Sequence, residues 1–75
     1  MEKYRQAFIE AFGVSEGELE TLKYQGITEW DSVGHMNLVT IIEDAFGISM
    51  DTDDIIDFNS FEKGKELLAK YDIIV

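Results

Sequence analysis

Ser32 is the residue whose neighbours suggest the most specific chemistry, because Asp31 precedes it and His35 follows three positions later. A catalytic serine needs a base that a third group holds, and oxyanion donors in a dry cleft. Three residues this close along the start of one helix cannot converge on one reacting atom in that way. We therefore expect no catalytic residue in this chain and interpret His35 as a residue at the edge of the core.

A metal site is the second chemistry to consider, since residues 51–53, Asp-Thr-Asp, begin like a calcium-binding loop and Glu62 stands at its twelfth position. Such a loop needs glycine where this sequence has Ile56, and Ile55 occupies a ligand position. The sequence has no cysteine, so a thiolate site and a disulfide are excluded. We expect no metal site, and the lack of cysteine favours the cytoplasm.

A third possibility is that Ser32 is the substrate of another enzyme. Modification requires an exposed hydroxyl at a rigid position, a neighbouring surface on which the enzyme docks, and no competing thiol. The sequence around Ser32 is consistent with all three. These considerations alone allow either a phosphorylated module or a carrier that bears a covalent group.

The element that must position Ser32 is a helix from Ser32 or Val33 to Phe46. Asp31 and Ser32 both favour the N-cap position, and Gly47 suits a left-handed C-cap. The apolar residues at helical spacing that are expected to face the core are His35, Leu38, Val39, Ile42 and Phe46.

A second row on this helix is a candidate partner-binding surface. Its members are Val33, Met36 and Thr40, beside Asn37, Glu43 and Asp44. The alternative, that the row widens the buried face, stays open because periodicity does not count the neighbours of a helix.

The rest of the chain predicts an all-α fold, a four-helix bundle formed by a single domain over residues 1–75. Helices are expected at Glu2–Phe12, at Thr52–Phe58 with Thr52 as its cap, and from Asn59 or Ser60 onward, with a turn or two of helix after Ser15. Three helices are long and the third is short. The first connection is long, and its segment 23–30 is held to the core by aromatic and aliphatic side chains. Gly64 indicates close packing of the last helix, and the apolar tail, residues 72–75, is expected to fold back.

The net charge of −10 restricts the partners. No lysine or arginine lies between Lys23 and Lys63, a span that holds nine acidic residues. Such a surface repels nucleic acid and anionic lipid and attracts basic protein surfaces. No apolar run approaches the length of a membrane span. We expect a monomer that does not insert into membranes.

The order of these features resembles the acyl carrier protein family. The residues that carry the resemblance are Asp31-Ser32-Val33 at the start of the second helix, then Leu38, Ile42, Glu43-Asp44 and Phe46-Gly47-Ile48, and finally Ser60-Phe61 after the short helix. The resemblance covers essentially the whole chain and implies a bundle of the acyl carrier type. Val33 stands where leucine is usual, and Trp30, Gly34 and His35 also depart from the common pattern, which resembles stand-alone carriers of specialised pathways.

By this resemblance Ser32, beside Asp31, carries a phosphopantetheine arm that holds an acyl group as a thioester. The arm comes from coenzyme A through a phosphopantetheinyl transferase that uses magnesium. Further partners are an acyl-loading ligase or acyltransferase and the downstream synthase enzymes of fatty acid or polyketide biosynthesis. Two alternatives stay open: an aminoacyl or peptidyl carrier, and an unmodified acidic helical protein-interaction module.

Overall fold

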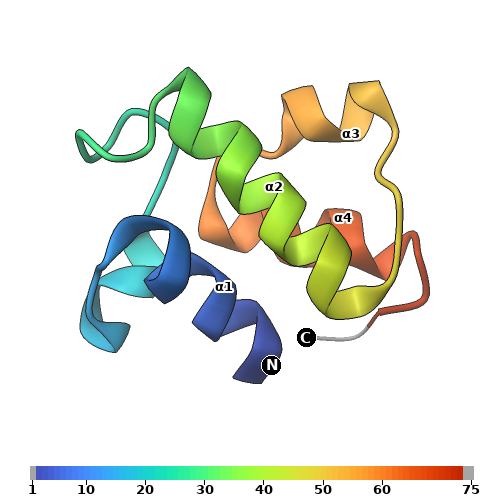
Figure 1. Ribbon diagram of the computed structural model, residues 1–75, viewed down its shortest axis with the longest axis horizontal. Coiled ribbons are helices and arrows are strands. Elements are labelled where there is room, and N and C mark those ends of the chain that lie inside the picture. The colour runs from blue at the N-terminus through green and yellow to red at the C-terminus, as the bar shows by residue number, and fades with distance from the viewer. Residues whose placement is uncertain (1, 74–75) are drawn as a thin grey trace.

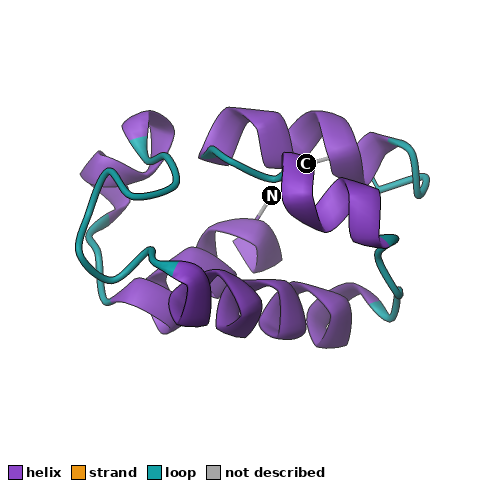
Figure 2. Cartoon of the chain, turned by 90° about the horizontal axis from the view of Figure 1, so that it is seen from above, coloured by secondary structure: helices purple, strands orange, loops and turns teal. Residues whose placement is uncertain are grey.

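Five helices follow one another along the chain, and the computed structural model describes residues 2–73. Their bounds are α1 (Glu2–Phe12), the 3₁₀ helix η1 (Glu16–Thr21), α2 (Ser32–Phe46), α3 (Thr52–Asp57) and α4 (Phe61–Ala69). In Figure 1, α2 runs across the front with α1 and α3 on either side, and α4 lies behind it. Figure 2 shows helices and loops alone over the described residues. The all-α prediction is confirmed, including the short third helix and the long first connection.

The ends of the helices follow from local sequence signals. Gly13 and Gly47 take left-handed conformations, with φ of 67° and 65°, and end α1 and α2 as expected. Ser60 caps α4, where its hydroxyl accepts the N–H of Lys63 at 2.9 Å. One prediction was wrong in detail: Thr52 is the first residue of α3, and Asp51 occupies the N-cap position.

Aromatic side chains from distant parts of the sequence form the centre of the core. Phe8 of α1 lies with its ring centroid 5.6 Å from that of Trp30 and 5.0 Å from that of Phe61. Large apolar side chains at these spacings supply most of the free energy that a small domain gains on folding. The fully buried residues at this centre include Tyr4, Phe8, Trp30, Phe58 and Phe61.

Gly64 permits α4 to approach this cluster. A β-carbon at position 64 would collide with the hydroxyl of Tyr4 and the ring of Phe58. The close packing predicted for Gly64 is therefore confirmed. Glycine is required here by space, since its helical backbone would otherwise favour alanine.

The connection between η1 and α2 is attached to the start of α4. The N–H of Tyr24 donates to the carbonyl of Asn59 at 2.8 Å, and the N–H of Phe61 donates to that of Leu22 at 3.0 Å. Trp30, near the end of the connection, is fully buried. Backbone bonds and one large side chain thus hold both ends of the segment that leads to Ser32, as expected.

The chain after α4 turns back toward that helix, where the N–H of Ile73 donates to the carbonyl of Leu68 at 3.1 Å. Ile73 also packs against the core. The remaining part of the predicted fold-back, Ile74 and Val75, lies outside the described residues. Across residues 2–73, no helix has the length and apolar character that crossing a membrane requires.

Candidate functional site at the start of helix α2

Ser32 is the first residue of α2, and its side chain is exposed. The capping role belongs to Asp31, whose Oδ1 accepts the N–H of Gly34 at 2.8 Å. The hydroxyl of Ser32 is therefore not needed to satisfy the backbone of the first turn. Its Oγ lies 3.2 Å from the hydroxyl oxygen of Tyr24. The predicted position of Ser32 at a helix start is confirmed, and Asp31 is the residue that caps it.

Gly34 allows the preceding connection to lie directly on the first turn of α2. A β-carbon at this position would collide with the carbonyl oxygen of Glu29 and come within 3.3 Å of the ring of Phe12. The missing side chain is what lets backbone and helix approach so closely. Sequence reasoning registered Gly34 only as a departure from a family pattern, because a glycine in a helical run does not reveal what packs on it.

His35 connects three segments around the site. The indole N–H of Trp30 donates to its Nδ1 at 3.0 Å, and its Nε2 lies 2.7 Å from the carbonyl oxygen of Ile55 in α3. Because an indole N–H can only donate, this network places the imidazole proton on Nε2, which donates to that carbonyl. Both ring nitrogens are thus engaged, so His35 has no nitrogen free to act on Ser32.

The second row of residues on α2, which begins with Val33 and Met36, is exposed to solvent near the N-terminus of the helix. Val33 is 80% exposed and Met36 is 50% exposed. Thr40 and Asn37 are exposed as well, and the hydroxyl of Thr40 donates to the carbonyl of Met36 at 2.9 Å. The row is therefore not a widening of the buried face, which is formed by Leu38, Val39 and Ile42, with His35 and Phe46 half-buried.

Ile56 in α3 is a third exposed apolar residue, at 70%, and sequence reasoning missed it. The contact between His35 and Ile55 brings α3 beside the first half of α2. Val33, Met36 and Ile56 are the large apolar side chains that the described residues leave exposed, all on these two helices. We call them together the apolar patch. The signal in the sequence was the Ile55-Ile56 pair in a short helix that can bury only one of its faces.

The acidic residues near the patch differ in their roles. Asp44 is exposed, whereas Glu43 is half-buried, and its Oε2 accepts the N–H of Met50 at 2.8 Å. Glu43 thus holds the connection after α2 while it still contributes charge. Asp53 and Asp57 are exposed on α3, the helix that carries Ile56. Negative charge therefore accompanies both helices of the patch.

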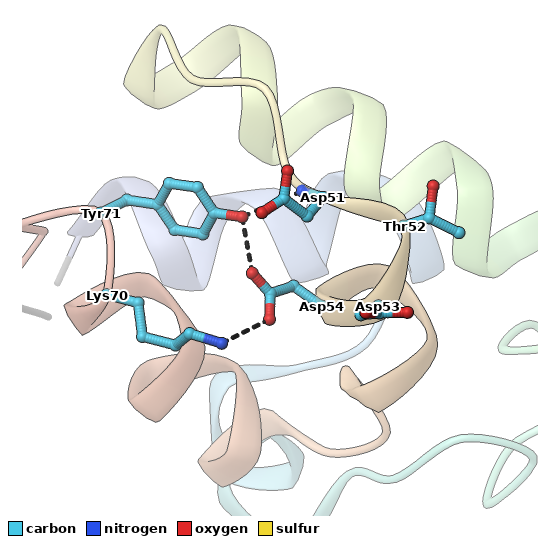
Figure 3. A pocket seen from close by; sticks show the side chains of 6 residues that line it. All are labelled: Asp51, Thr52, Asp53, Asp54, Lys70 and Tyr71. Atoms are coloured by element: carbon cyan, nitrogen blue, oxygen red, sulfur yellow. Dashed lines mark hydrogen bonds and ion pairs between the residues drawn. The ribbon is translucent and has the colours of Figure 1, made fainter.

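A separate polar pocket at the start of α3 is occupied by its own side chains (Figure 3). The carboxylate of Asp54 accepts Lys70 Nζ at 2.6 Å on one oxygen and the Tyr71 hydroxyl at 2.6 Å on the other. The Tyr71 oxygen in turn accepts the N–H of Asp51 at 2.9 Å. These bonds, first that of Lys70, hold the pKa of Asp54 below its usual value. We call Asp54, Lys70 and Tyr71 the polar clamp, because they join α3 to the end of α4.

Within residues 2–73, no three histidine or acidic side chains are grouped so that they could hold a metal ion. The acidic run from Asp51 instead begins α3, and Asp54 is bound to Lys70 and Tyr71.

Comparisons of the chain with protein-family models, with curated proteins and with solved structures found no match.

Proposed function

We propose that this chain is an acyl carrier protein in which Ser32 bears a phosphopantetheine arm with an acyl group in thioester linkage. The observation that carries the proposal is the exposed Ser32 hydroxyl on the first turn of α2, which Asp31 leaves free by capping the helix itself. A phosphodiester at this position would lie at the positive end of the dipole of a 15-residue helix. The finer description of the fold, a bundle of the acyl carrier type, is part of the same proposal.

The proposed modification is a transfer from coenzyme A to Ser32. The Oγ atom attacks the phosphorus that bears the pantetheine, so an Oγ–P bond forms. The bond from this phosphorus to the bridging oxygen of the diphosphate breaks, and adenosine 3′,5′-bisphosphate leaves. The hydroxyl proton passes to a base. Because both ring nitrogens of His35 are engaged and Asp31 caps the helix, we assign the base and the magnesium ion to the phosphopantetheinyl transferase.

The same geometry supports a role in which the chain performs no catalysis on its cargo. A thioester on the arm would meet no cysteine thiol, since the sequence has none, and His35 offers no free nitrogen. The protein would position the cargo for other enzymes and act as a monomer in the cytoplasm. Its own residues would provide the surface to which those enzymes bind.

The partners of the proposed carrier would recognise the apolar patch and its acidic surroundings. These partners are the transferase, an acyl-loading ligase or acyltransferase, and the downstream synthase enzymes. Apolar contacts supply affinity, and the acidic charge speeds encounter with a basic surface. We assign Val33, Met36, Asn37, Thr40 and Asp44 to this recognition, and we add Ile56 to them. Glu43 contributes charge from a position that also stabilises the fold.

An unmodified protein-interaction module is the second candidate, and the exposed apolar patch favours it independently of Ser32. Such a module would bind a basic partner through the same surface and need no arm. An aminoacyl or peptidyl cargo would use the same serine, so it differs from the main proposal in cargo alone.

Intact-mass measurement separates the carrier from the module. The full chain is incubated with coenzyme A, magnesium and a broad-specificity phosphopantetheinyl transferase. The proposal predicts a mass gain of one phosphopantetheine per chain. A chain that keeps its original mass, while a known carrier in the same tube is modified, would favour the unmodified module.

A further inference from the structure

Tyr24 stands next to the proposed attachment site in a way that the fold does not require. Its hydroxyl oxygen is 3.2 Å from Ser32 Oγ, and the contact is exposed to solvent. Two exposed hydroxyls can bond to water equally well, so this pair adds little to folding. The contact places a hydrogen-bonding group directly at the oxygen that the arm would occupy.

The phenol ring of Tyr24 is held in place by the surrounding structure. Its backbone N–H donates to the carbonyl of Asn59 at 2.8 Å, and its ring packs edge-on against that of His35, with centroids 5.5 Å apart. The side chain is half-buried. A hydroxyl on a ring fixed in this way is pre-organised for whatever is attached to Ser32.

The other two tyrosines have structural partners for their hydroxyls. Tyr4 donates to the carbonyl of Phe61 inside the core, and Tyr71 donates to Asp54 in the polar clamp. Tyr24 therefore differs from both in having its hydroxyl beside an exposed serine. This difference also makes Tyr71→Phe a suitable control, because this variant loses a tyrosine hydroxyl that is bonded to Asp54 and not to Ser32.

Modification would determine the direction of the hydrogen bond. An esterified Oγ has no proton, so it can only accept, and the Tyr24 hydroxyl must be the donor. The anionic oxygens of a phosphodiester lie two bonds beyond Oγ and accept more strongly than an ester oxygen. Asp31, the residue before Ser32, carries a carboxylate that caps the helix and repels a phosphate.

We propose that Tyr24 is a positioning residue whose hydroxyl donates to the phosphate of the arm on Ser32. This inference rests on the proposed function. The phosphate is then held at the Tyr24 hydroxyl, next to the ring of His35. The phosphate end of the arm, attached to Ser32, thus has a fixed direction, while the distal thiol end remains free to move.

The test uses the full chain, loaded from coenzyme A by the transferase, as wild type, Tyr24→Phe and Tyr71→Phe. The phosphorus NMR signal of the phosphodiester responds directly to a hydroxyl that donates a hydrogen bond to a phosphate oxygen. We expect the signal of folded wild type to differ from that of the same loaded chain unfolded in urea, which keeps the phosphodiester. In folded Tyr24→Phe it should move toward the unfolded value, and in folded Tyr71→Phe it should stay at the wild-type value.

A second measurement needs no variant, so it stands even if Tyr24→Phe folds poorly. The resonance of the tyrosine ring carbon that bears the hydroxyl is followed in wild type before and after loading. It should shift for Tyr24 and stay unchanged for Tyr4. A loaded wild type in which neither the Tyr24 resonance nor the phosphorus signal responds would overturn this inference alone. A wild type that gains no arm would overturn the proposed function, and this inference with it.

Discussion

The indole N–H of Trp30 donates to Nδ1 of His35 across 3.0 Å, and the two rings are stacked with an interplanar angle of 19°. Trp30 is fully buried, so its N–H has lost its contact with water and needs this acceptor. The other nitrogen of His35 bonds to α3 through the carbonyl of Ile55. One imidazole thus joins the connection before Ser32, helix α2 and helix α3.

The first prediction is that His35→Ala destabilises the protein by about 1–3 kcal/mol, because it leaves the buried indole N–H of Trp30 without an acceptor. His35→Asn should recover part of this loss, since an amide oxygen can take the place of Nδ1. Urea unfolding, followed by the fluorescence of the single tryptophan, measures both variants. Equal stability of His35→Ala and wild type would show that the bond contributes nothing.

The second prediction concerns Gly34. Alanine normally stabilises a helix by about 1 kcal/mol over glycine. At position 34 the added methyl group meets the carbonyl oxygen of Glu29, so we expect Gly34→Ala to destabilise by about 1–3 kcal/mol. Gly17→Ala in η1 is the matched control, because a β-carbon there has no neighbour within 4 Å. Thermal unfolding compares the two, and a stabilised Gly34→Ala would contradict the packing described for this turn.

The third prediction concerns acid sensitivity. The hydrogen bonds of Lys70 and Tyr71 depress the folded-state pKa of Asp54. The stability that comes from this shift is present above the unfolded-state pKa of about 3.9 and is lost as the pH falls through the folded-state value. The difference in unfolding free energy between wild type and Asp54→Asn should therefore shrink as the pH is lowered below about 4.

Chemical denaturation at a series of pH values measures this difference. Asp53→Asn removes the same charge from an exposed neighbour and should keep the acid dependence of wild type. If Asp54→Asn and wild type lost stability in parallel over the whole range, the polar clamp would not be the source of acid sensitivity.

The fourth prediction addresses the apolar patch. Met36→Ser and Ile56→Ser should each raise the KM of the transferase for this chain about fivefold, if each removes about 1 kcal/mol of apolar contact. Because both side chains are exposed in the free protein, unfolding temperatures should change little. Ala69→Ser, at an exposed position of α4, is the control. Unchanged KM values for both patch variants would remove the patch from transferase recognition.

The sequence was sufficient to predict those features that depend on local signals. The helices α1 and α2 and their glycine ends follow from periodicity and the left-handed preference of Gly13 and Gly47. The start of α4 follows from the capping preference of Ser60. Such signals act within one or two turns of the chain, so they can be read without knowing the tertiary fold.

Contacts between distant residues could not be predicted in the same way. The bond from Tyr24 to Ser32 and that from His35 to Ile55 depend on how the first connection and α3 fold over α2. Ile56 looked like half of an apolar pair until the orientation of α3 was known. The choice of Asp31 over Ser32 as the cap also depends on backbone geometry, because both residue types suit that position.

The central claim, that Ser32 is the attachment site, is tested most directly by locating the arm within the chain. The protein is loaded from coenzyme A, digested and fragmented in a mass spectrometer, beside Ser32→Ala and Ser49→Ala. We predict one phosphopantetheine on Ser32 in wild type and in Ser49→Ala. Ser32→Ala should gain no mass and keep its helical circular dichroism, because Asp31 caps α2. An arm on Ser15, Ser49 or Ser60, or any gain of mass by Ser32→Ala, would contradict the assignment.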